Sequence, residues 1–175
     1  MSKFIIDTNV WVVASGKAPQ STPECVEACL EILRSLQQAG ASLVVDEASF
    51  MSNPPGNSVL EEFKNNLDEG DYGYDLFWRK LFPRWGVDWE VDLVELLYDV
   101  SGAILPNGIT ITQQHPDGGS GPFEPNDRKW IALQLIHPNH PVINNATDSD
   151  WEKARQDLTT NNIKIKQLCT GRDIP

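Results

Sequence analysis

The chain has 175 residues, of which 40% are hydrophobic and 22% are charged, and its formal net charge at pH 7 is −11. This length and composition are typical of one globular domain with a full hydrophobic core, and they exclude a disordered chain. The excess of 25 acidic over 14 basic residues argues against a protein that binds nucleic acid by general electrostatics. That argument weakens where carboxylates gather around bound cations, because the cations remove the repulsion of phosphates.

Hydrophobic periodicity divides the chain into short strands that alternate with helices. Apolar runs predict strands at 3–6, 42–45, 141–144 and 163–166. Apolar residues on one face predict helices directly after residue 7 and at 21–40, 58–67, 74–82, 127–136 and 150–161. Strands that alternate with helices predict an α/β fold with a parallel sheet covered on both faces.

The helix expected at 21–40 carries signals at both of its ends. Ser21 and Glu24 have the spacing of a capping box. Gly40 suits the position that follows the end of a helix. These signals make it the clearest helix of the chain.

The least regular part of the sequence spans residues 70–126. The stretch 91–100 suits either a helix or a strand, and 106–125 is a loop rich in proline and glycine. A loop of this length is either a mobile surface excursion or a contributor to a functional site. The sequence shows no internal repeat and no domain boundary, so we expect one domain over 1–175.

Four acidic residues occur at the ends or edges of these predicted elements. Asp7 directly follows a strand and Asp148 comes a few residues after another, and open α/β sheets bind ligands at the carboxyl ends of their strands. Asp127 begins a helix, and Glu62 lies beside the apolar face of its helix, whereas Glu61 points towards solvent. Acids that converge from several elements would suit Mg²⁺ or Mn²⁺, which prefer carboxylate oxygen ligands.

Each acid also has a purely structural interpretation. Taken singly, the aspartates are explained equally well as helix caps, and Glu62 as an exposed acid beside Lys64. The caps would be Asp7, Asp127 and either Asp148 or Asp150. The ordered combination of all four positions is harder to explain by capping alone.

This ordered combination resembles the PIN-domain family of metal-dependent nucleases. The matching stretches are FIIDTN at 4–9, VLEEF at 59–63, NDRKWIAL at 126–133 and NATDSDW at 145–151. The resemblance follows the whole chain in order, although only these short blocks are specific.

The resemblance implies a three-layer α/β/α sandwich with a central, mainly parallel sheet. It also implies a magnesium or manganese site at which RNA phosphodiesters, single-stranded or structured, are hydrolysed. The implied catalytic and metal-binding acids are Asp7, Glu62, Asp127 and Asp148, with Asp150 as an accessory metal ligand. Asn9 and Thr147 would support these acids or position a water molecule. Arg128 and Lys129, next to Asp127, would meet a substrate phosphate, although a solvated helix face explains them too.

The expected reaction uses one or two cations that bind the scissile phosphate and lower the pKa of a water molecule, which then attacks in line. Many PIN-like proteins are toxins of bacterial toxin–antitoxin pairs, so an antitoxin protein and a homodimer are implied partners. Compact toxins are shorter, and the segment 70–126 resembles an insertion into the domain. Two other functions stay open: a phosphohydrolase of small phosphate esters, and a catalytically silent PIN-like module that binds RNA or protein.

Two further stretches have weaker interpretations. Residues 78–85 interleave basic and aromatic residues, a composition that suits stacking on unpaired bases, or an amphipathic helix with its aromatics inward. His137 and His140 have a ligand-like spacing, but the prolines around them indicate a plain turn. The sequence contains no nucleophile motif, Walker loop or dinucleotide fingerprint.

The sequence also predicts a cytoplasmic protein without membrane contact. No apolar stretch is long enough to span a bilayer, and the amino-terminal residues do not resemble a signal peptide. The chain has three cysteines, an odd number, and no second cysteine cluster that would complete a zinc site. Cys25 and Cys29 lie four residues apart on one predicted helix, so we expect both to fill the core.

Overall fold

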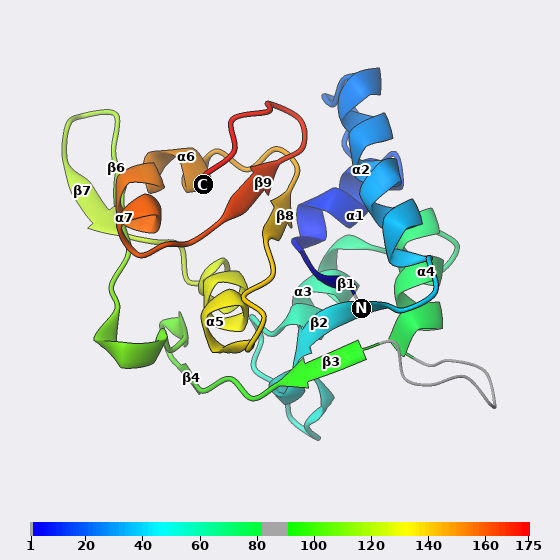
Figure 1. The fold of residues 1–175 in the computed structure, drawn as a ribbon, viewed down its shortest axis with the longest axis horizontal. Helices are drawn as coiled ribbons and strands as arrows, with labels where there is room; N and C mark the ends of the chain where they lie inside the picture. Colours follow the sequence, from blue (N-terminus) through cyan, green and yellow to red (C-terminus); the bar gives the residue numbers. More distant parts are fainter. Residues whose placement is uncertain (1, 82–90) are drawn as a thin grey trace.

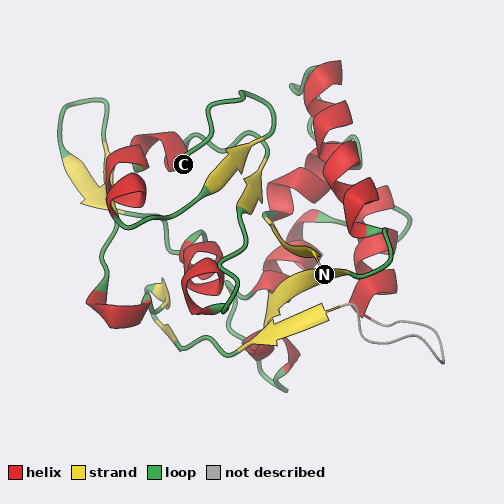
Figure 2. Ribbon diagram, in the orientation of Figure 1, coloured by secondary structure: helices red, strands yellow, loops and turns green. Residues whose placement is uncertain are grey.

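The computed structural model describes residues 2–81 and 91–175. Its centre is a five-stranded parallel sheet with the strand order β3-β2-β1-β8-β9 (Figure 1 and Figure 2). The strands are β1 (Ser2–Ile6), β2 (Ala41–Asp46), β3 (Val91–Val94), β8 (Ile143–Asn145) and β9 (Ile165–Gln167). Because every neighbouring pair runs parallel, the carboxyl ends of all five strands lie at one edge of the sheet.

Helices cover both faces of this sheet (Figure 1). One side carries α1 (Thr8–Ala14), α2 (Pro23–Leu36), α3 (Val59–Asn66) and α4 (Tyr72–Leu81). The other side carries α5 (Arg128–Ile136), α6 (Asp150–Lys153) and α7 (Arg155–Thr160). The expectation of an α/β sandwich with three layers is therefore confirmed.

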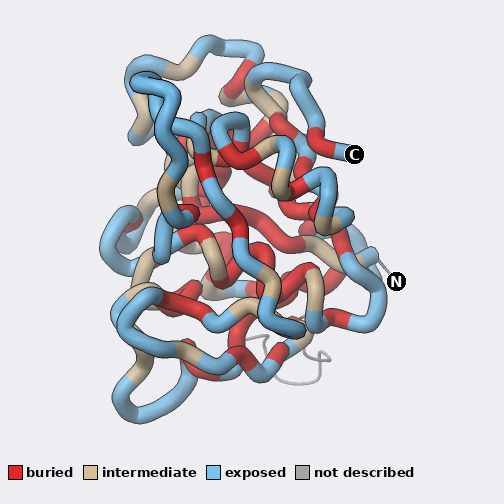
Figure 3. The backbone as a smooth tube through the Cα atoms, turned by 90° about the vertical axis from the view of Figure 1, so that its left-hand side faces the viewer, coloured by how far each residue is buried: buried red, intermediate tan, exposed pale blue. Residues whose placement is uncertain are grey.

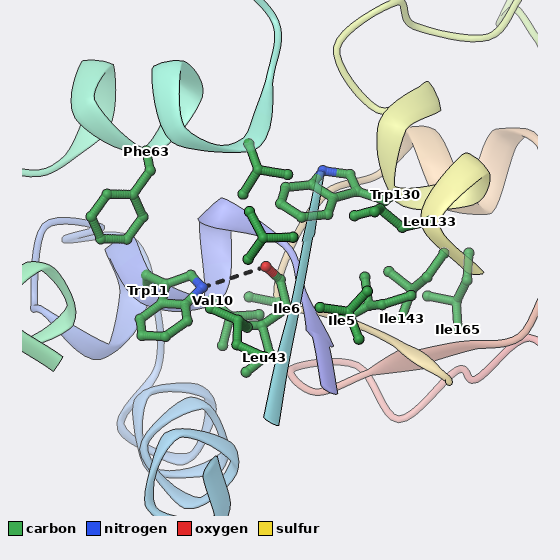
Figure 4. Packing of buried hydrophobic residues seen from close by; sticks show 14 of the residues in the cluster. Ile5, Ile6, Val10, Trp11, Leu43, Phe63, Trp130, Leu133, Ile143 and Ile165 are labelled. Carbon is green, nitrogen blue, oxygen red and sulfur yellow. Dashed lines mark hydrogen bonds between the residues drawn. The ribbon is translucent and has the colours of Figure 1, made fainter. Parts of the chain in front are cut away.

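The core lies on both faces of the central strands (Figure 3 and Figure 4). On the side of α1, the indole of Trp11 donates to the carbonyl of Ile6 at 3.4 Å and meets Phe63 and Phe77 edge-on. On the side of α5, Trp130 is equally buried. Burial of such large apolar side chains is the main source of stability, and it holds the strand ends in place.

The predicted elements overlap the observed ones, most of them with ends that differ by a residue or two, and two of the predicted helices need correction. The helix at 21–40 begins at Pro23, and Thr22 is its cap, since the Thr22 side chain accepts from the N–H of Cys25 at 3.2 Å. Ser21 is therefore not the capping residue, because the proline that suits the first helical position follows Thr22. The helix ends at Leu36, and Gly40 lies beyond a further turn with a φ of 80°.

The helix expected at 150–161 is two short helices, α6 and α7, which meet at Ala154. The undecided stretch 91–100 forms β3 and the short strand β4 (Tyr98–Asp99), which pairs with β5 (Gly102–Ala103).

The loop expected at 106–125 contains a short helical turn (Pro106–Gly108) and a hairpin of β6 (Thr112–Gln114) and β7 (Ser120–Pro122). This hairpin is not a free excursion, because the residue that follows it, Phe123, is buried against Trp151 with ring centres 5.1 Å apart.

Cys25 corrects the sequence interpretation of the cysteines. It forms a disulfide with Cys169, which lies 144 residues later, so it is not a simple core residue. Cys29 is buried and free, as expected, and burial raises the pKa of its thiol to about 12. Within the described residues, none of the helices has both the length and the apolar character that crossing a membrane requires.

Candidate metal centre

Asp7 connects β1 to α1 and presents its two carboxylate oxygens to different surroundings. Oδ1 accepts a hydrogen bond from the N–H of Asn9 at 3.2 Å, which caps α1. Oδ2 is buried and has no hydrogen-bond partner among the described residues. Burial, followed by the charge of Glu62, raises the pKa of the Asp7 carboxyl to about 8. A buried oxygen of this kind is stabilised by a proton or by a cation.

Asp127 and Asp148 bring two more carboxylates to the same place. Asp127 occupies the N-cap position of α5, but its side chain caps none of the helix N–H groups described. Asp148 follows β8, and its Oδ1 accepts the N–H of Asp150 at 2.8 Å. One carboxylate oxygen from each of Asp7, Asp127 and Asp148 lies within 4.8 Å of the other two. Local hydrogen bonds to backbone N–H groups therefore explain the position of one oxygen of Asp7 and one of Asp148. They do not explain why carboxylates of three separate segments converge.

The three carboxyl groups perturb one another. Burial, followed by the charges of Asp7 and Asp148, raises the pKa of Asp127 to about 9. Burial is also the largest cause of the raised pKa of Asp148. Like charges this close do not all ionise without a counter-ion. The cluster therefore retains protons near neutral pH unless a cation binds.

Glu62 reaches the cluster from α3 together with a lysine. The ammonium of Lys129 donates to Glu62 Oε2 and to the carbonyl of Asn126, and the lysine side chain is 0% exposed. Lys129 is therefore a buried counter-ion of the acids. The solvated helix face does not describe it, and the ammonium expected to meet a substrate phosphate contacts Glu62 and Asn126 instead. Lys64, the neighbour expected for an exposed Glu62, pairs instead with Glu61 at 3.0 Å.

Asn9 joins the ends of two strands. Its Nδ2 donates to Asn145 Oδ1 at 2.7 Å, and its Oδ1 accepts the N–H of Ala146 at 2.9 Å. Asn145 in turn donates to the side chain of Gln167 on β9. These bonds hold the segment after β1 against the segment after β8, and so they set the position of Asp7 relative to the loop that carries Asp148.

Asp46 is a buried acid at this edge that the sequence reasoning missed. It ends β2, and its Oδ1 accepts from Ser49 Oγ at 2.5 Å and from the N–H of Val59 at 3.1 Å. Its Oδ2 accepts from the hydroxyl of Tyr98 at 2.7 Å. Burial, followed by the Asp46 charge, raises the pKa of that hydroxyl, which stays a donor. Both oxygens of Asp46 are thus engaged, and the residue orients the first turn of α3, which carries Glu62.

The remaining candidate residues lie around the cluster. Asp150 pairs with Lys153 at 2.5 Å and is not one of the three acids whose oxygens converge. Thr147 is exposed. Arg128 is half-buried and lines a cavity that the three converging acids do not line.

The structure shows where part of the basic and aromatic segment 78–85 and the two histidines lie. Phe77 and Trp78 pack in the aromatic group of α1, α3 and α4, while the part of the basic and aromatic segment at 82–85 lies outside the described residues. His137 Nε2 lies 3.3 Å from Asp92, and His140 Nδ1 lies 2.9 Å from the carbonyl of Gln134. The two histidines have different partners, as expected for a plain turn.

Comparisons of this chain with protein-family models, with curated proteins and with solved structures return no match. The PIN-domain resemblance therefore rests on the short sequence motifs alone.

Proposed function

We propose that this protein is a metal-dependent nuclease, specifically an endoribonuclease that hydrolyses RNA phosphodiesters with Mg²⁺ or Mn²⁺. The observation that carries the proposal is the convergence of Asp7, Asp127 and Asp148, whose oxygens lie within 4.8 Å of one another. These acids come from three separate segments and meet at the carboxyl edge of a parallel sheet, where α/β proteins bind their ligands.

The chemistry of the cluster fits a hard divalent cation. All of the converging atoms are carboxylate oxygens, and Asp7 Oδ2 lacks any partner in the described part of the chain. The raised pKa values of Asp7 and Asp127 mean that the apoprotein lacks the positive charge needed to ionise all three acids. Cysteine or histidine ligands, which would favour zinc or copper, are absent from this group of three.

A bound divalent cation would supply charge to bind the scissile phosphate and to acidify a water molecule. The three aspartates would hold it, with Asp7 oriented by Asn9. Lys129 occupies Oε2 of Glu62, which leaves Oε1 to orient the attacking water molecule. Lys129 also offsets part of the negative charge of the site, and this favours one cation over two.

The test is cleavage of labelled single-stranded RNA by the purified protein, with Mn²⁺ and with EDTA. Cleavage should require Mn²⁺, and Asp148→Asn should abolish it, whereas the matched control Asp68→Asn, an exposed acid that pairs with Lys17, should retain it. Cleavage in EDTA, or an unchanged rate in Asp148→Asn, would refute the proposal. Release of phosphate from small esters without RNA cleavage would make the protein a phosphohydrolase instead.

The buried ammonium of Lys129 also favours a second candidate function. The ammonium of Lys129 already supplies part of the positive charge that a bound cation would bring to the acids. A cluster neutralised in this way suits a PIN-like module that binds a partner without catalysis. Such a module would not bind Mn²⁺ at the three aspartates, and calorimetry with Mn²⁺ separates the two candidates.

An antitoxin partner, a homodimer and a cytoplasmic location are further parts of the proposal that derive from the resemblance and the sequence. The Cys25–Cys169 disulfide is the observation that opposes the location, because disulfides are rare in cytosolic proteins. Thiol counting on protein isolated from cells under acid quench tests it, since three free thiols are expected in the cytosol.

A further inference from the structure

A cavity of 590 Å³ opens beside the acid cluster, between the β4–β5 and β6–β7 hairpins and the start of α5. We call it the hairpin cavity. Much of its wall is apolar, formed by residues such as Ala103, Leu105, Ile109 and Pro122. Polar groups of Asp99 and Ser120 stand among them, and Arg128 contributes the one cationic side chain of the described lining.

The hairpin cavity and the acid cluster share two walls. At the start of α5, Asp127 belongs to the cluster and the next residue, Arg128, to the cavity. On β4, the Tyr98 hydroxyl donates to Asp46 near the acids, while the next residue, Asp99, lines the cavity. Consecutive residues therefore serve the two sites, so the start of α5 and β4 form the partition between the cavity and the acid cluster.

Gly102 allows the β4–β5 hairpin to pack closely against the segment before α5. Its φ is +99°, and a Cβ atom there would lie 2.4 Å from the carbonyl oxygen of Pro125. The β4–β5 hairpin can therefore approach the segment before α5 this closely only with glycine at this position. The cavity is thus a feature of the packed fold.

Arg128 is the cationic residue of the hairpin cavity. Its guanidinium is half-buried and forms no hydrogen bond or ion pair with the residues that the structure describes. In a protein with a net charge of −11, an arginine without an acidic partner is notable, because 25 acidic residues compete for 14 basic ones. A guanidinium matches the oxygens of a phosphate with paired N–H donors.

Building on the proposed function, we propose that the hairpin cavity takes the base of an unpaired nucleotide beside the scissile phosphate, while Arg128 binds a phosphate of that nucleotide. The apolar wall suits the faces of a base, and the polar groups suit its edge. A base in a duplex is stacked and paired, and it would first have to leave the helix to enter. The substrate class is therefore single-stranded nucleic acid, bound by few phosphate contacts, in keeping with the acidic surface.

The experiment measures binding in EDTA, so that no cleavage occurs. A short fluorescent single-stranded RNA and the same strand annealed to its complement are titrated with the wild-type protein and three variants. Arg128→Gln removes the phosphate contact, Ile109→Trp fills the cavity, and Lys166→Gln removes the same charge from β9, which does not line the cavity. Circular dichroism establishes that each variant is folded.

The proposal predicts that the single strand binds more tightly than the duplex. Arg128→Gln and Ile109→Trp should each weaken single-strand binding by about tenfold, while Lys166→Gln should change it by less than about twofold. Arg128→Gln should also make the slope of log K against log salt concentration shallower by about one unit, the contribution of one phosphate contact. Equal binding of duplex and single strand, or an Arg128→Gln variant that matches Lys166→Gln, would overturn the proposal.

The same variants separate this proposal from the proposed function. If Mn²⁺-dependent cleavage occurs with the same KM in Ile109→Trp, the cavity is not the base site, although the protein is a nuclease. If the single strand binds as predicted but is not cleaved with Mn²⁺, the base-binding role of the cavity is supported and the nuclease function is refuted.

Discussion

Lys129 donates from its ammonium to Glu62 in the interior of the protein, and the same ammonium lies 4.7 Å from the centre of the Trp130 ring. The lysine and the glutamate are 67 residues apart and come from helices on opposite sides of the sheet. This contact holds the ammonium of Lys129 beside the aspartates of the candidate metal centre, where its charge lowers the pKa values of Asp7 and Asp127 relative to burial alone.

Lys129→Met should destabilise the apoprotein by about 3 kcal/mol, because removal of one partner leaves buried acids without their counter-ion. Mn²⁺ should then stabilise the variant more than it stabilises the wild type. The measurement is thermal unfolding in EDTA and in Mn²⁺. The control Lys64→Met removes an exposed charge that pairs with Glu61, and it should change the stability by less than about 0.5 kcal/mol. Equal effects of the two substitutions would contradict the role given to Lys129.

The raised pKa values predict how stability depends on pH. Asp7 and Asp127 have pKa values of about 8 and about 9 in the folded apoprotein, against 3.8 for an ordinary aspartate. The folded state therefore binds protons that the unfolded chain has released. The resulting contribution to stability is complete below about pH 4 and is lost as the pH rises through 8 to 9. Urea unfolding in EDTA should show this decline, and Asp127→Asn should flatten it.

The same protons must leave when a cation binds, so Mn²⁺ affinity should rise between about pH 6 and pH 9. Calorimetry in two buffers with different ionisation enthalpies would measure the protons released. Proton release well above zero at pH 7 is the expected outcome. Binding without proton release would mean that the cation sits away from Asp7 and Asp127.

The Cys25–Cys169 disulfide predicts a dependence of stability on reductant. It closes a loop between residues 144 apart, so its reduction should cost about 3–5 kcal/mol and lower Tm by about 6–15 °C. Thermal unfolding with and without dithiothreitol measures this. Cys169→Ser should have the lower Tm already and should not respond to the reductant. A wild-type Tm that is indifferent to reductant would show that the bond is not formed in solution.

An apolar run followed directly by aspartate marks the carboxyl end of a buried strand, and this pattern predicts the position of Asp7. Asp148 comes a few residues after another strand, so its position is predicted less directly. The same pattern precedes Asp46, the last residue of β2, so the local sequence does not distinguish Asp46 from Asp7. Both oxygens of Asp46 then proved to have partners within the protein, and sequence spacing carries no information about that.

Two features of the structure had no usable local signal. The sequence predicts that Lys129 meets a substrate phosphate or lies on a solvated face, yet α5 is apolar on nearly all sides and buries its first turn, so a charged residue there needs an internal partner. Cys169 follows an edge strand, and periodicity along α2 cannot identify which distant residue lies against Cys25. Both depend on contacts between segments far apart in the chain.

A crystal of the protein soaked in Mn²⁺, with an anomalous difference map, tests most directly whether the three aspartates bind a cation. We expect a peak that is bound by carboxylate oxygens of Asp7, Asp127 and Asp148 at about 2.0–2.3 Å, the range of hard-cation coordination. An empty cluster at saturating Mn²⁺, or a peak that contacts none of these three aspartates, would contradict this expectation.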